Sequence, residues 1–192
     1  IGNLIEQGSG KTEAAISISE VNQRQVSRAL IQGNVCSTAA GHGIQCLSSD
    51  DVSIHGNLIV ATGPAKAGVL VRSESSPVTG VSVRDNDVGL RGAGSWQWGV
   101  RLAATEAHAM GDLSVTGNSI KGAREGIAFD GRRYLNTPIC ALNRTAADVA
   151  VPLTGIDGLP EDALVVGGAF SASAAEPTGG GGRHLIGLGD PN

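Results

Sequence analysis

The chain has 192 residues and a formal net charge of −4, with 41% hydrophobic and 3% aromatic residues. A chain of this length can bury a core of its own, and its acidic balance without a basic run argues against a nucleic-acid partner. No apolar run approaches the roughly 18 residues of a membrane-spanning helix, so we expect no membrane insertion. Because aromatic side chains are scarce, the core must be built from Val, Ile, Leu and Ala in many similar layers.

An asparagine that recurs along the chain marks an internal repeat. Five copies follow Gly or Asp and a sixth is degenerate, giving Asn3, Asn34, Asn57, Asn86, Asn118 and Asn143, at steps of 31, 23, 29, 32 and 25 residues. Apolar residues stand five and three positions before most copies, and another stands two positions after. A spacing of two is typical of a strand with one buried face. We expect the asparagine to adopt a left-handed conformation at a corner and to bond to adjacent turns.

A second apolar block follows each asparagine after a loop of variable length. Its copies are residues 15–18, 43–46, 68–71, 99–102 and 126–129. One such turn cannot bury its own inward face, whereas stacked turns can, because each strand pairs in parallel with its copies about 4.8 Å away. The three cysteines, Cys36, Cys46 and Cys140, fall at apolar positions of the repeat. We expect them to be small buried hydrophobic residues and not a disulfide framework or zinc site.

Over residues 1–151 this pattern resembles the pectate-lyase-like family of right-handed parallel β-helices. The resemblance implies an all-β fold, a right-handed single-stranded parallel β-helix of about five to six turns. The alternative is an antiparallel β-sandwich, which would need hairpin signals such as Asn-Gly between strands, whereas Gly-Asn lies within them here. Lyases, hydrolases, epimerases and non-enzymatic phage tail proteins share the β-helix, so the fold does not select a function.

Beyond Asn143 the repeat loosens toward two further strands. Val149, Val151 and Leu153 predict one strand, and residues 163–168 predict a last strand that caps the coil. We therefore expect the β-helix with its cap to span residues 1–168. Residues 171–192 include four consecutive glycines, a composition typical of a flexible tether, and their ending resembles the lead-in to a further module in phage tail proteins.

The best acidic cluster in the sequence surrounds the fourth asparagine. It comprises Asp85 and Asp87, with Asp112 in the next repeat and Arg84 and Arg101 nearby. The lyases of the family that the chain resembles gather Asp residues for Ca²⁺ and use Arg or Lys as base, and hydrolases use paired carboxylates. These five residues are the candidate catalytic set. The favoured interpretation is a solvated outer face, because outward Asp and Arg side chains on a coil usually serve solubility.

Two tryptophans stand close together in the repeat with the longest insertion. Trp96 and Trp98 are two residues apart, so on an extended segment they would share one face. That face would form a sugar-stacking platform or a subunit contact. The equally weighted alternative is that both rings pack on the outside of the coil to cover it.

Taken together, these patterns favour a non-catalytic structural module of a larger phage-like tail or surface protein that contacts a glycan or receptor. The alternative is a polysaccharide lyase, hydrolase or epimerase acting in an outer groove. We expect no resident cofactor, although Ca²⁺ is possible if the chain is a lyase. The expected partners are other copies of the chain, as in a homotrimer, and a polysaccharide or cell-surface glycan. The expected location is the virion or the extracellular surface.

Overall fold

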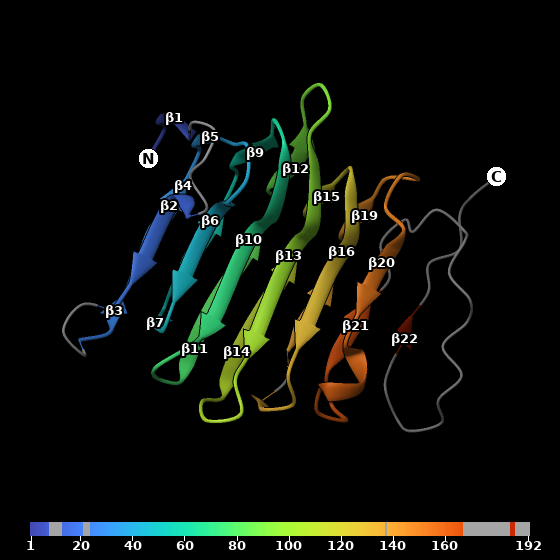
Figure 1. The fold of residues 1–192 in the computed structure, drawn as a ribbon. Helices are drawn as coiled ribbons and strands as arrows, with labels where there is room; N and C mark the ends of the chain where they lie inside the picture. Colours follow the sequence, from blue (N-terminus) through green and yellow to red (C-terminus); the bar gives the residue numbers. More distant parts are fainter. Residues whose placement is uncertain (8–12, 21–23, 137, 167–184, 187–192) are drawn as a thin grey trace.

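The computed structural model describes residues 1–7, 13–20, 24–136, 138–166 and 185–186. Their strands wind into a coil whose turns lie side by side from the N-terminal end onward (Figure 1). Within these residues every strand pair is parallel, and each strand pairs with its equivalents in neighbouring turns. The predicted parallel β-helix is confirmed. The β-sandwich is excluded, because it requires antiparallel sheets.

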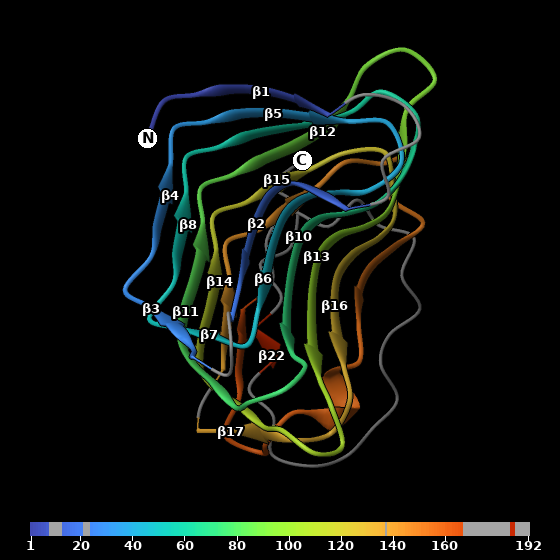
Figure 2. The same cartoon turned by 60° about the vertical axis from the view of Figure 1, so that its left-hand side comes forward.

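Three sheets form the walls of the coil, as Figure 2 shows in a view closer to its axis. In order of pairing, the first sheet consists of β1 (Leu4–Gln7), β5 (Val35–Thr38), β9 (Leu58–Ala61), β12 (Asp87–Leu90), β15 (Ser119–Ile120) and β19 (Arg144–Thr145). The second sheet consists of β2 (Ala14–Ser19), β6 (His42–Leu47), β10 (Pro64–Ser73), β13 (Ser95–Ala104), β16 (Ala123–Asp130) and β20 (Val151–Thr154).

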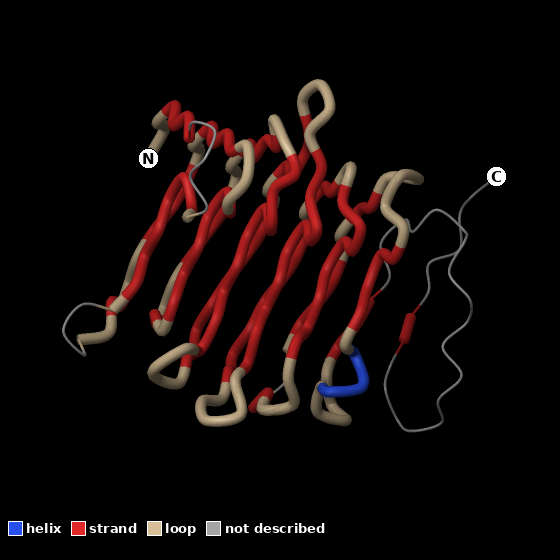
Figure 3. Tube along the Cα trace, in the orientation of Figure 1, coloured by secondary structure: helices blue, strands red, loops and turns tan. Residues whose placement is uncertain are grey.

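The third sheet closes the coil. Its strands pair in the order β4 (Leu30–Gln32), β8 (Ser53–His55), β11 (Val78–Arg84), β14 (Met110–Thr116), β18 (Ile139–Ala141), β21 (Leu164–Val166) and β22 (Leu185–Ile186). Besides these, β17 (Tyr134–Leu135) pairs with β14, and β3 (Val26–Ser27) pairs with β7 (Ser49–Asp50). The loops gather at the strand ends, and a short 3₁₀ turn, η1 (Ile156–Gly158), follows β20 (Figure 3).

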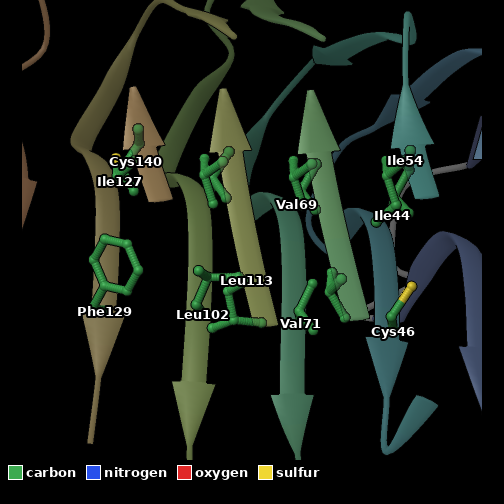
Figure 4. Packing of buried hydrophobic residues seen from close by; sticks show 14 of the residues in the cluster. Ile44, Cys46, Ile54, Val69, Val71, Leu102, Leu113, Ile127, Phe129 and Cys140 are labelled. Carbon is green, nitrogen blue, oxygen red and sulfur yellow. The ribbon is translucent and has the colours of Figure 1, made fainter. Parts of the chain in front are cut away.

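Equivalent apolar side chains stack into columns inside the coil. The first-sheet column contains Ile5, Cys36, Ile59, Val88, Ile120 and Thr145. The second-sheet column contains Ile16, Ile44, Val69, Val100, Ile127 and Leu153. The third-sheet column contains Ile31, Ile54, Val83, Val115, Cys140 and Val165. Figure 4 shows second-sheet side chains such as Ile44 pointing toward third-sheet side chains such as Ile54. The core is thus one repeated layer, as the scarcity of aromatics predicts.

The three cysteines are part of this core, as the repeat predicts. All are buried and free, and Cys36 and Cys140 lie in the first-sheet and third-sheet columns. Burial raises the pKa of the Cys36 thiol to about 11 and that of the Cys46 thiol to about 12. They therefore stay protonated at neutral pH and act as small apolar side chains.

The recurring asparagines form a hydrogen-bonded ladder at the corner between the third and first sheets. The backbone N–H of Asn86 donates to Oδ1 of Asn118 at 3.0 Å, and its side-chain Nδ2 donates to the same oxygen at 2.9 Å. The same pair of bonds links Asn3 to Asn34, Asn34 to Asn57, Asn57 to Asn86, and Asn118 to Asn143. The five later asparagines are buried. The corner therefore satisfies buried polar groups turn by turn, as the repeat predicts.

The left-handed residue of this corner is not the asparagine, which corrects the expectation stated above. The residue before each asparagine has the positive φ instead, as in Gly117 at 67°, Asp85 at 54° and Leu142 at 57°. Glycine adopts this conformation without steric cost, and aspartate tolerates it better than most residues. The two residues of the corner thus have different roles. The first adopts the left-handed conformation that makes the turn, and the asparagine makes the hydrogen bonds.

A second left-handed position precedes the strands of the third sheet or lies within them. It is occupied in successive turns by Arg28, Asp51, Gly80, Asp112 and Asn136, with φ between 50° and 68°. Polar residues with short side chains and glycine are favoured at such positions. Asp51 therefore has a backbone role at this position. Oδ1 of Asp50 accepts the N–H of Thr79 at 2.7 Å.

The final turns carry the predicted C-terminal strands. β20 includes Val151 and Leu153, whereas Val149 is buried just before the strand begins. β21 pairs with β18 through Cys140 and Val165, so the second expected strand is present too. β21 also pairs with β22 through Val165, so the third sheet continues past the strand that the sequence assigns to the cap. Of the segment 171–192, predicted to be a tether, only residues 185–186 are described, and they form the strand β22.

Thr145 interrupts an otherwise apolar column, and its replacement by valine is expected to stabilise the fold. Its side chain is buried, and its hydroxyl has no hydrogen-bond partner among the described residues. Thr145→Val removes this unpaired hydroxyl at nearly constant shape, so we expect the free energy of unfolding to rise by about 1–2 kcal/mol.

Urea denaturation measures this difference, with Thr38→Val as the control. The Thr38 hydroxyl donates to Oε1 of Gln7 at 2.6 Å and accepts the N–H of Gly41 at 3.1 Å, so its loss should destabilise the chain. A Thr145→Val protein that is no more stable than the parent would contradict the assignment.

Candidate functional site

The predicted acidic cluster is spread over the coil. Arg84 ends β11 in the third sheet and Asp87 begins β12 in the first, with Asp85 at the corner between them. Asp112 lies on β14 in the third sheet, and Arg101 lies on β13 in the second. Within the described residues the ion pairs are Arg72–Glu74 and Arg101–Asp130, so none joins two members of the cluster. The structure brings Arg84, Asp85 and Asp87 together only as neighbours in sequence.

Two of these acids occupy left-handed backbone positions. Asp85 takes the corner position that Gly33, Gly56 and Gly117 take in other turns, and Asp112 takes the second left-handed position. Oδ1 of Asp112 also accepts Nδ2 of Asn136 from the next turn at 2.8 Å. Local conformation therefore accounts for both aspartates without reference to a ligand.

Arg101 belongs to a different cluster, on the outer side of the second sheet. Its Nε donates to Oδ2 of Asp130, and its Cζ lies 3.9 Å from the centroid of the Trp98 ring. The two partners come from the same sheet, since Trp98 and Arg101 lie on β13 and Asp130 ends β16. A cation–π contact and an ion pair thus hold one guanidinium in place between an aromatic ring and a carboxylate.

The two tryptophans differ in exposure, which departs from the expectation of a shared outer platform. Trp96 is only 2% exposed and belongs to the core cluster, and its Nε1 donates to the carbonyl oxygen of Gly89 at 2.7 Å. Trp98 is half-buried and carries Arg101 on its ring. Gly89 lies on β12, before the loop that leads into β13, and its hydrogen bond holds the Trp96 ring inside the coil. Of the two tryptophans, Trp98 is therefore the one whose ring a ligand can contact.

A groove of about 570 Å³ surrounds Trp98 and Arg101. Its apolar lining includes Leu70, Ala103 and Ala104. Its polar lining comprises His42, Lys66, Arg72, Gln97, Thr105, Glu106 and Asp130. A neighbouring hollow of about 810 Å³ shares Lys66 and Gln97 with it, so the two adjoin along the sheet.

His42 is a neutral member of this groove. Burial, with smaller contributions from the nearby charges of Lys66 and Arg101, lowers its pKa from 6.5 to about 4. Its Nδ1 accepts the N–H of Ala67 at 3.3 Å. The neutral ring therefore carries its proton on Nε2, which leaves one uncharged donor.

This buried histidine is expected to make the protein less stable in mild acid. The folded-state pKa of about 4 lies below the ordinary value of 6.5, so the unfolded chain binds more protons between these values. The contribution of His42 is therefore complete above pH 6.5 and is lost as the pH falls toward about 4, up to roughly 3 kcal/mol.

Urea denaturation at a series of pH values measures this dependence. His42→Gln, which keeps an acceptor for the Ala67 N–H, should flatten the slope of stability against pH in that window. An unchanged slope in the variant would show that other groups cause it.

Sequence reasoning missed Asp130, His42, Lys66 and Gln97. A signal for part of this set was present, because Lys66, Gln97 and Arg124 each stand two residues before the glycine of the second apolar block. In the register of the second sheet these positions follow one another from turn to turn. The pairing of Arg101 with Asp130, 29 residues apart, required the three-dimensional register.

Neither a metal centre nor a relative identifies the site further. Among the described residues, no three His, Cys, Asp or Glu side chains gather into a group that could hold a metal ion. No helix in that part of the chain has the length and apolar character needed to cross a bilayer. No protein-family model, curated protein or solved structure matches this chain.

Proposed function

We propose that this β-helix is a non-catalytic structural module of a larger phage-like tail or surface protein, and that it contacts a glycan or glycosylated receptor through the groove around Trp98. The observation that carries the proposal is the half-buried Trp98 ring in a groove on the outer side of the second sheet. An aromatic ring with polar neighbours is a favourable surface for a sugar, which has apolar C–H faces and a rim of hydroxyls.

The fold supports a role in display of this surface. Four parallel strands, β6, β10, β13 and β16, hold most of the groove residues at fixed spacing, and the buried columns and the asparagine ladder connect successive turns. Pre-organised side chains lose little conformational freedom when they bind a ligand. The resemblance of the repeat to phage tail β-helices favours an extracellular or virion location and packing of three copies side by side, which would present several such grooves.

We do not favour catalysis by the acidic cluster predicted from the sequence, because its acids and its candidate base lie on different sheets. A hydrolase needs two carboxylates about 5–10 Å apart across one groove. Asp87 is on the first sheet, Asp112 on the third and Arg101 on the second. If the chain does cleave acidic glycans, an Asp85→Asn, Asp87→Asn double variant will show whether those residues are responsible.

Trp98→Ala tests the proposed glycan contact. We expect the variant to lose roughly tenfold or more in affinity for glycans that the parent binds on an array, because the stacking surface is removed. Leu58→Ala is the matched control, since Leu58 is a 40% exposed apolar residue on the outside of the first sheet. Parent protein that binds no glycan, or equal binding by all three proteins, would contradict the proposal.

A further inference from the structure

Two of the three basic residues around Trp98 are paired with acids, Arg101 with Asp130 and Arg72 with Glu74. The groove is lined by three basic residues, Lys66, Arg72 and Arg101, and by two acidic residues, Glu106 and Asp130. Glu74 adds a third acid, since its Oε1 lies 3.6 Å from the guanidinium of Arg72. The basic and acidic residues of this region are therefore equal in number.

Several polar groups of the groove are suited to hydroxyls. Arg101 has a carboxylate counter-ion in Asp130, which leaves its remaining N–H groups as donors without an uncompensated charge. His42 supplies a neutral Nε2–H donor, as derived above, and the Gln97 amide supplies both a donor and an acceptor. A sugar hydroxyl both donates and accepts, so it can bond to each of these groups, whereas a ligand carboxylate would meet Asp130 beside every bond to Arg101.

From this arrangement we infer that the groove selects neutral, hydroxyl-rich glycans over acidic ones, and that Asp130 determines this selectivity by holding and neutralising Arg101. The inference rests on the proposed glycan contact and adds the class of ligand. Asp130 is a specificity-determining residue in this scheme, and Trp98 is the stacking surface for the sugar.

The charge of Asp130 can be removed with little change of shape. Asp130→Asn leaves the backbone carbonyl of residue 130, which accepts the Tyr134 hydroxyl at 2.7 Å, in place. Arg101 then keeps its cation–π contact with Trp98 but loses its counter-ion. An uncompensated guanidinium in a groove binds carboxylates strongly, so the preference should change from neutral toward acidic ligands.

The experiment compares the parent and variants on an array of matched neutral and uronate-containing oligosaccharides, at low and high salt. The parent is expected to prefer the neutral members, with affinities that change little with salt. Asp130→Asn is expected to improve the affinity ratio of acidic to neutral ligands roughly tenfold at low salt, and high salt should remove the gain. Arg101→Ala in the Asp130→Asn background should abolish it.

Asp87→Asn is the control for loss of one negative charge, because Asp87 is exposed on the first sheet, away from the groove. A parent protein that prefers acidic glycans would overturn the inference, as would an Asp130→Asn protein with an unchanged ratio or an Asp87→Asn protein with the same shift. In each of these cases loss of binding in Trp98→Ala would leave the proposed function standing. Absence of glycan binding by the parent would instead reject the proposed function.

Discussion

Replacement of Asn118 by alanine is expected to lower the free energy of unfolding by about 3–5 kcal/mol, the cost of opening a buried hydrogen-bond network. Oδ1 of Asn118 accepts both the backbone N–H and Nδ2 of Asn86. Its Nδ2 donates to Oδ1 of Asn143 at 2.9 Å and to the carbonyl oxygen of Val83 at 2.9 Å. The side chain is fully buried, so water cannot replace these partners without opening the corner.

Chemical denaturation followed by circular dichroism measures this loss, and Asn3→Ala is its matched control. Asn3 belongs to the same ladder but is exposed, and its side chain donates to Oδ1 of Asn34 at 3.0 Å. Its replacement should therefore cost less than about 1 kcal/mol. Equal effects of the two substitutions would mean that the ladder does not stabilise the coil from within.

Replacement of Gly99 by alanine is expected to destabilise the fold by about 3 kcal/mol or more. A Cβ atom at Gly99 would lie 2.5 Å from Cγ2 of Ile120 and 2.6 Å from the carbonyl oxygen of Gly126. The equivalent glycines, Gly43, Gly68 and Gly126, meet the first-sheet column and the next turn at similarly short distances. Four copies of the second apolar block begin with glycine because the first-sheet side chains and the next turn occupy the space of a methyl group there.

Thermal unfolding is a sensitive readout of this substitution. For a chain of this size each kcal/mol corresponds to roughly 2–4 °C, so Gly99→Ala should lower the Tm by about 6–12 °C. Gly89→Ala is the control, because a Cβ atom at Gly89 would have no neighbour within 4 Å. That variant should keep or slightly raise the Tm, since alanine restricts the unfolded chain. A Tm loss of the same size at both positions would reject the steric explanation.

The architecture could be predicted from the sequence because one physical requirement recurs in every turn. A buried asparagine between two apolar strands leaves a pattern that survives loops of different length, so six weak copies together predict stacked turns. The apolar columns follow from the same alignment, including the first-sheet position where Thr145 replaces an apolar residue. The left-handed residue was misassigned, because Gly and Asn both tolerate that conformation and only the backbone shows which of them adopts it.

The candidate site was less accessible to sequence reasoning. Acidic residues close in sequence, such as Asp85 and Asp87, suggest a catalytic or metal site, yet Asp85 occupies a left-handed backbone position at the corner. Arg101 was recognised but was grouped with the wrong partners, because its ion pair crosses from β13 to β16. The two tryptophans are adjacent in the strand pattern, and a single hydrogen bond to Gly89 distinguishes the buried one. Contacts between turns depend on loop lengths, which a repeat alignment does not fix.

The most direct test of the account is an NMR measurement of scalar couplings across the asparagine hydrogen bonds. The backbone amide nitrogens of Asn3, Asn34, Asn57, Asn86 and Asn118 should each couple to the side-chain carbonyl carbon of the asparagine one turn further on. Both asparagines are buried in the four pairs that follow Asn3–Asn34, so the backbone amides of Asn34, Asn57, Asn86 and Asn118 should also exchange slowly with solvent. Couplings between these successive pairs would establish the stacked coil that holds Trp98, Arg101 and Asp130 on one face. Their absence, with rapid exchange of the same amides, would contradict the fold and with it the proposed groove.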